Sequence, residues 1–161
     1  MALDHPDTIR ILVFLEEIGI PVSRGRIEGD SFLPGIEVRD GGLMLDSERA
    51  FYPGDLLHEA GHIAVTDPAE RPTLSEVRDD PGEEMAAIAW SYAAARAIGI
   101  DTQVLFHADG YKGEGAALAT AFDNGAGPGA PLLQFYGMTA EAHQAEALGL
   151  PAYPQMARWL R

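Results

Sequence analysis

The spacing of apolar residues along the chain predicts a protein built mainly of helices. Between residues 7 and 18, apolar positions recur every three or four residues, which is the period of a helix with one buried face. These positions are Ile11, Leu12, Leu15 and Ile18. Gly19 and Pro21 follow directly, so we expect this first helix to end there.

The next part of the chain has the pattern of short strands. Residues 22–35 mix polar and apolar side chains with three glycines, and they predict a strand followed by a loop. Residues 35–39 and 43–46 flank an Asp-Gly-Gly turn at 40–42, which is typical of a β-hairpin. We therefore expect a small antiparallel sheet, whose edge strand could hold an extended peptide or only cover the core.

Two longer helices are predicted in the middle of the chain. The first, at 53–66, opens with the start signal Pro-Gly-Asp. It stops at Asp67-Pro68, because a residue before proline is pushed out of the α region. The second, at 82–95, is rich in alanine, a strong helix former, and follows a proline. An acidic connector with three prolines, residues 66–82, separates the two helices.

The remaining pattern completes an expectation for the fold. Shorter helices are predicted around 101–107, 114–123, 131–147 and 153–161, with a loop rich in glycine and proline at 123–131. The fold class is therefore α+β, mainly helical, with a small antiparallel β-sheet preceding the first central helix. A chain of 161 residues that is 47% hydrophobic can bury one core, so residues 1–161 are expected to form a single domain.

Composition and charge exclude several classes of partner and chemistry. Eleven basic and 25 acidic residues give a net charge of −14, which repels nucleic acid and anionic membranes, so neither is expected as a partner. The absence of cysteine excludes disulfides, thiol catalysis and thiolate metal sites. The N-terminus has no signal-peptide pattern, and no apolar stretch is long enough to span a bilayer. We therefore expect a cytoplasmic protein.

The most informative motif is His-Glu-Ala-Gly-His at 58–62, within the first central helix. Residues four apart lie on one face of a helix, so His58 and His62 can hold one zinc ion. Zinc held in this way keeps an open position for water and lowers the pKa of that water toward ~7. Glu59 lies beside this position, where it can accept a proton from the water. The alternative is a surface helix that carries two histidines without a metal.

The third ligand distinguishes the known classes of this motif. Metzincins need glycine and histidine where this chain has Val65 and Pro68, and peptide deformylases need a cysteine ligand, so both classes are excluded. A carboxylate from the second central helix remains. Glu84 and Glu83 lie 22 and 21 positions after His62, in the first turn, where the helix dipole favours the ionised form. Adjacent helical residues point about 100° apart, so we expect only one of the two to bind the metal.

The motif and the alanine-rich helix resemble the gluzincin metallopeptidases, and they are most similar to the small bacterial ImmA/IrrE-like family. The second helix of that family reads Glu-Ala-x-x-Phe-Ala, which places residues 84–89 in register. Met85 stands where the family has a small residue, and Ile88 where it has an aromatic one. The resemblance covers about residues 53–95 and implies a zincin-like fold. It also implies the site residues: zinc ligands His58, His62 and Glu84, and general base Glu59.

Gluzincins usually add a histidine or tyrosine, from beyond the second helix, that stabilises the oxyanion formed at the attacked carbonyl. His107 and Tyr111 lie in a polar turn that contains glycine and are the two further catalytic candidates, with His143 as a third. The expected function is zinc-dependent hydrolysis of a peptide or protein substrate. Two alternatives stay open: a metal-binding regulatory or protein-interaction module with little turnover, and a zinc hydrolase of non-peptide amides.

Overall fold

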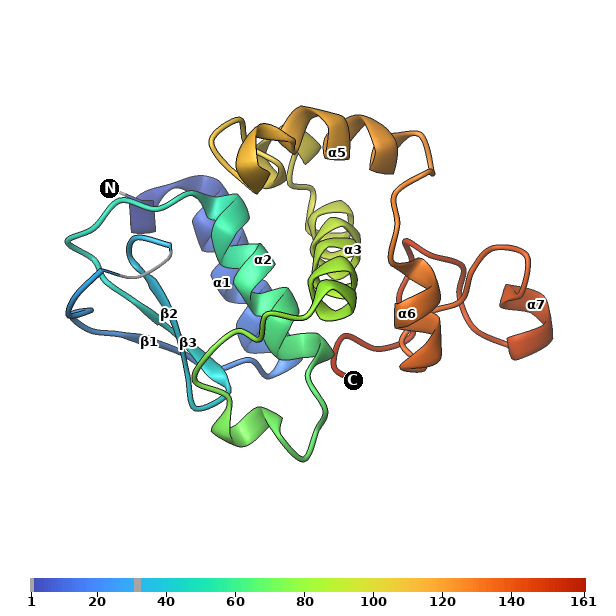
Figure 1. Cartoon of the computed structure of the whole chain (residues 1–161), viewed down its shortest axis with the longest axis horizontal. Coiled ribbons are helices and arrows are strands. Elements are labelled where there is room, and N and C mark those ends of the chain that lie inside the picture. The colour runs from blue at the N-terminus through green and yellow to red at the C-terminus, as the bar shows by residue number, and fades with distance from the viewer. Residues whose placement is uncertain (1, 31–32) are drawn as a thin grey trace.

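The structure, a computed structural model, describes residues 2–30 and 33–161 (Figure 1). Residues 31 and 32, in the predicted loop, lie outside the described part. A short 3-10 turn at Ala2–Asp4 precedes helix α1, which spans Pro6–Ile18 and confirms the first predicted helix. The ring of His5 caps α1 by accepting a hydrogen bond from the amide of Asp7 at 3.2 Å.

Three short strands form one sheet in the order β1-β3-β2. They are β1 (Val22–Arg24), β2 (Ile36–Arg39) and β3 (Gly42–Leu45). The β2–β3 hairpin is antiparallel, as predicted, but β1 pairs in parallel with β3, so the sheet is mixed and the prediction of an antiparallel sheet is wrong. The end of β1 and the start of β2 both lie opposite Leu45, so the chain between them crosses the end of β3. Alternating polarity marks the strands but does not specify their partners.

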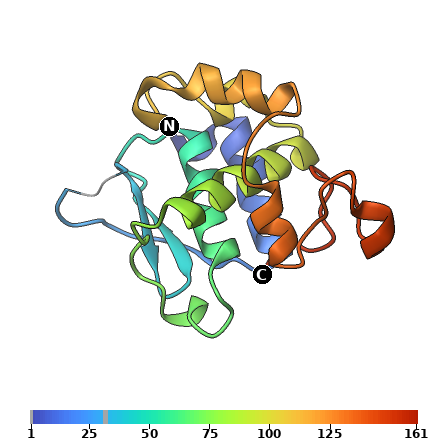
Figure 2. The same ribbon diagram turned by 45° about the vertical axis from the view of Figure 1, so that its right-hand side comes forward.

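The two central helices are α2, Pro53–Val65, and α3, Pro81–Ile98. α1 and α2 pack against each other, with the sheet on one side of them and α3 on the other in Figure 1. In the turned view of Figure 2, α3 crosses in front of them. β2 and β3 pack against α2, whereas β1 packs against α1. The connector between α2 and α3 contains one 3-10 turn, Arg71–Thr73. The prediction of two long helices joined by an irregular connector is confirmed.

The C-terminal half contains only short helices. They are α4 (Thr102–Leu105), a 3-10 turn (Tyr111–Gly113), α5 (Gly115–Asp123), α6 (Ala130–Phe135) and α7 (Ala145–Leu148). The predicted helix at 131–147 is therefore wrong between α6 and α7. Gly137 adopts a φ of 72°, which ends the helix, and the hydroxyl of Thr139 then donates to the carbonyl of Gln155 at 2.6 Å. These contacts tie the segment to the C-terminus.

The prediction of a helix at 153–161 is also wrong. Several amides of this segment donate to distant carbonyls instead of to carbonyls four residues earlier. Ala157 donates to Met138 at 2.8 Å, and Arg161 donates to Ala64, near the end of α2, at 2.9 Å. The indole of Trp90 donates to the carbonyl of Trp159 at 2.9 Å. The C-terminal segment is thus an irregular stretch of turns and bends that contacts both α2 and α3.

The buried apolar residues of these elements form one core. It includes side chains from α1, the sheet, α2, α3 and the segments that follow α3. None of the helices in the described part of the chain has the length and apolar character that crossing a bilayer requires. The α+β fold class is confirmed, with helices dominating and a small sheet placed before α2.

Candidate metal centre

The two histidines of the motif point to the same place. His58 and His62 lie one turn apart on α2, and their Nε2 atoms are 3.2 Å from each other. His62 is almost fully buried, with 1% of its side chain exposed, while 12% of the His58 side chain is exposed. The helical spacing therefore produces the paired nitrogens that the sequence predicts.

Glu84, in the first turn of α3, completes the group. Its two carboxylate oxygens lie 3.3 Å from His58 Nε2 and 2.8 Å from His62 Nε2. Ligands bound tetrahedrally to zinc at about 2.0–2.1 Å are separated by roughly 3.3 Å, so these three side chains fit a zinc ion. Within residues 2–30 and 33–161, they are the one group of histidines and acidic residues with donor atoms close enough to share an ion.

Close packing of α2 on α3 brings Glu84 to the histidines. A Cβ atom on Gly61 would lie 2.7 Å from the carbonyl oxygen of Ala87 and 3.2 Å from the ring of Trp90. Only glycine allows this approach of the two helices. The small side chains of α3, with Ala86, Ala87 and Ala94 fully buried, serve the same close contact. The glycine in the motif thus has a structural cause.

Glu83 lies behind His62 and does not join the three converging atoms. Its Oε1 is 3.6 Å from His62 Nδ1, and both atoms are buried without a hydrogen-bond partner in the part of the chain that the structure describes. The amide of Glu83 is bonded at 2.8 Å to Asp80, which caps α3. A carboxylate on the far nitrogen of a metal-binding histidine orients the ring and fixes its tautomer. Glu84 is therefore the better candidate ligand.

The electrostatics of the cluster favour an ionised Glu84. Contacts from the imidazoles of His58 and His62 hold the pKa of Glu84 far below its usual value, although burial works in the opposite direction. Burial lowers the pKa of His62, but the contact with Glu84 and the charges of Glu59, Glu84 and Glu83 outweigh burial and leave this pKa raised. The cluster has more negative charge than its histidines can balance, which favours a cation.

Glu59 lies beside the cluster with a free carboxylate. Among the described residues, no side chain forms a hydrogen bond or ion pair with it. Burial raises the pKa of Glu59, while the charges of His58 and His62 lower it. A carboxylate that is partly desolvated and unpaired is suited to accept a proton.

Tyr111 approaches the cluster from the segment after α4. Its ring packs edge-on against His58, with ring centroids 5.5 Å apart, and its hydroxyl is buried without a hydrogen-bond partner among the described residues. Burial, and then the charge of Asp55, raise the pKa of Tyr111, so the hydroxyl stays protonated. Tyr111 and Lys112 both have a φ of 54°, which is uncommon for residues with a side chain.

His107 contacts Asp55 of α2 and does not contact the three converging side chains directly. Its Nε2 is 2.7 Å from the carboxylate of Asp55, one turn before His58 on α2. The ring of Tyr52 stacks on His107 at a centroid distance of 3.9 Å, and the Tyr52 hydroxyl donates to Asp109. The sequence did not indicate Asp55 as a site residue, because acidic residues are common in the first turn of a helix. Only its contact with His107 distinguishes it.

The third candidate, His143, lies elsewhere. It is exposed and lines a cavity of about 750 Å³ between α3, α5 and the loop 125–131. Its Nε2 is 3.3 Å from Nε2 of the Gln144 side chain. The structure therefore gives no support to His143 as an oxyanion donor for the cluster.

Comparisons with protein-family models, with curated proteins and with solved structures gave no match. The chemistry of this site is therefore inferred from its own geometry.

Proposed function

We propose that the chain binds one zinc ion through His58, His62 and Glu84 and hydrolyses peptide bonds. The observation that carries this proposal is the convergence of two Nε2 atoms and a carboxylate at separations of 3.2, 3.3 and 2.8 Å. Zinc, when bound, would polarise a carbonyl and lower the pKa of a water molecule. Three protein ligands leave the open position that hydrolysis needs.

Glu59 is the proposed general base. It accepts a proton from the attacking water and passes it to the leaving amine. Its position next to His58 on the same helix, and its lack of a competing partner among the described residues, support this role. The raised pKa of Glu59 supports it as well, because a more basic carboxylate takes the proton more readily.

Tyr111 is the preferred candidate for the group that stabilises the oxyanion. Its protonated hydroxyl is buried, lacks a partner among the described residues, and belongs to a ring in contact with His58. A hydrogen-bond donor held in place before reaction is suited to charge that develops at a carbonyl oxygen. His107 is the second candidate, but its Nε2 is already engaged by the carboxylate of Asp55, at 2.7 Å.

The sheet supports a peptide as substrate. β2 is an edge strand of the sheet and packs against α2, with Ile36 and Val38 buried in the core. One edge of β2 is therefore free of a strand partner in the described residues, and an extended peptide could pair with it.

Two variants test the roles of the metal and the base. Glu59→Gln is expected to keep zinc and the fold while losing hydrolysis of a peptide library by ~100-fold or more. His58→Ala is expected to lose zinc, as measured by metal content after dialysis. Cleavage by Glu59→Gln at the wild-type rate would refute the base assignment. Stoichiometric zinc with no cleavage of any library peptide would leave a metal-binding module in place of a peptidase.

A further inference from the structure

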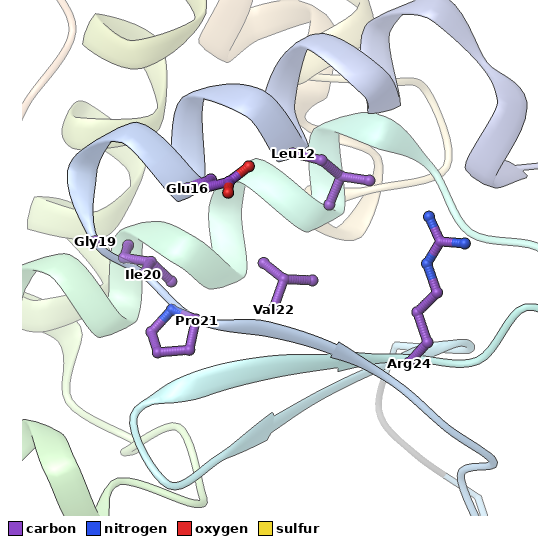
Figure 3. Close-up of a pocket in the computed structure, with 7 residues that line it drawn as sticks. All are labelled: Leu12, Glu16, Gly19, Ile20, Pro21, Val22 and Arg24. Carbon is purple, nitrogen blue, oxygen red and sulfur yellow. The ribbon is translucent and has the colours of Figure 1, made fainter.

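A groove of about 470 Å³ separates α1 from the edge strand β1 (Figure 3). Leu12 and Glu16 of α1 form one wall, and Val22 and Arg24 of β1 form the other. In Figure 3 the side chain of Val22 lies below Leu12 and Glu16, and Arg24 stands on the same side of the strand. None of these residues belongs to the metal centre.

The groove follows the outer edge of β1, which has no strand partner in residues 2–30 and 33–161. On the inner edge, the amide of Leu43 donates to the carbonyl of Pro21 at 2.9 Å, and the amide of Gly25 donates to that of Leu45 at 3.0 Å. Successive residues of a strand direct their backbone groups to opposite edges, so those of Val22 and Arg24 point outward. A strand with an open edge is a template for another strand.

Next to the groove, α1 exposes an apolar surface. Ile9 and Val13 are 50% and 51% exposed, which is unusual for large apolar side chains. On a helix with 100° between residues, they lie on the same face as Leu12 and Glu16. The open strand edge and this helix face thus form one surface.

The charges of the surface are complementary to those of a second copy. The chain has a net charge of −14, so two copies repel each other over most of their surface. The groove instead has one acid, Glu16, and one base, Arg24, and neither has an ion-pair partner among the described residues. In an isologous dimer every contact occurs twice, so an arrangement that brings Glu16 of one copy to Arg24 of the other forms two such ion pairs.

We propose that this surface binds a second copy of the chain through antiparallel pairing of the two β1 strands about an axis at Ser23. Val22 of one copy then lies opposite Arg24 of the other, which is the pair whose backbone groups point outward. Four backbone hydrogen bonds form, two on each side of the axis. The axis is perpendicular to the sheet, so Arg24 of each copy stands below Glu16 of the other. Beside this ion pair, the exposed Ile9 and Val13 side chains of one α1 helix pack against those of the other.

Sedimentation of the full chain over a concentration series into the millimolar range tests this proposal. The expected result is a monomer–dimer equilibrium with a limiting mass of twice 17.3 kDa, with zinc or with a chelator present. Glu16→Arg and Arg24→Glu, each alone, are expected to raise the dissociation constant by ~10-fold or more, because like charges then face each other. The double variant Glu16→Arg/Arg24→Glu is expected to restore dimerisation.

Val13→Glu supplies a further test, with Leu148→Glu as its control. Leu148 is 49% exposed on α7, so the two changes are matched in type and exposure. Val13→Glu is expected to be folded and monomeric, whereas Leu148→Glu is expected to dimerise as the wild type does. A monomeric wild type at every concentration, a dimer that survives Val13→Glu, or a double charge variant that stays monomeric would overturn the proposal. The readout is mass, so it does not depend on catalysis or on metal content.

Discussion

Replacing Gly61 by alanine is the sharpest test of how the candidate metal centre is built. The new Cβ would lie 2.7 Å from the carbonyl oxygen of Ala87, which is 0.7 Å short of an ordinary contact at 3.4 Å. The obstacle is backbone, so rotation of a side chain cannot relieve it. α2 and α3 must move apart by several tenths of an ångström, and this movement carries Glu84 away from His62.

Two opposing energies set the expected effect of Gly61→Ala on stability. Alanine favours the helix by up to ~1 kcal/mol over glycine. Overpacking of a close contact costs ~1–3 kcal/mol. The net expectation is a loss of about 0–2 kcal/mol in the free energy of unfolding, measured by urea denaturation of the protein with a chelator present. Zinc affinity should fall more clearly, by ~10-fold or more, because ligand positions are tolerated to about 0.2 Å.

Gly82→Ala is the control for helix propensity. Gly82 lies in the first turn of α3, and a Cβ there would lie 3.2 Å from Oδ1 of the capping residue Asp80, a side-chain contact that a small rotation can relieve. This variant should bind zinc as tightly as the wild type, and its free energy of unfolding should stay the same or rise. A Gly61→Ala protein that gains stability and binds zinc as tightly as the wild type would refute the argument that glycine sets the distance between the helices.

Two further predictions concern carboxylates. Glu83→Gln keeps an acceptor near His62 but removes the charge of Glu83. Zinc affinity, measured by competition with a chelator, is therefore expected to fall by ~10-fold, with little change in thermal stability. An unchanged zinc affinity would rule out the orienting role of Glu83. Asp46 accepts hydrogen bonds from the amides of Ile27 and Glu48, which lower its pKa. Its contribution to stability is therefore present above the unfolded pKa of ~4 and is lost as the pH falls through the lower folded pKa. Asp46→Asn should unfold more easily at pH 7 and show a shallower loss of stability in acid; parallel curves would contradict this account.

The sequence was most informative where chemistry depends on local geometry. His58 and His62 converge because a helix places residues four apart on one face, and nothing outside α2 is needed. The choice between Glu84 and Glu83 depends instead on the rotation of α3 against α2. That rotation is set by the packing of Gly61 on Ala87, which no local pattern reports.

Tyr111 and His107 show why the residue pattern of an irregular segment does not predict which side chain reaches a site. Both stood in a polar turn, and the sequence could not rank them. The structure separates them through contacts that depend on the path of the chain: Tyr111 has a positive φ and packs on His58, whereas His107 pairs with Asp55. A turn with side chains at positive φ is specified by its surroundings, not by its own residues.

The C-terminal segment explains why a helical pattern can be misleading. Its apolar residues pack against the core, as they would on an amphipathic helix, yet the backbone amides of Ala157 and Arg161 donate to distant carbonyls. Arg71 shows what this arrangement achieves: its guanidinium donates to the carbonyls of Ile63 and Thr66, at the C-terminal end of α2, and to that of Arg161. The C-terminal end of α2 is thus closed by residues from the connector and from the end of the chain. Because His62 lies in the last turn of α2, these distant contacts also hold a candidate ligand in place.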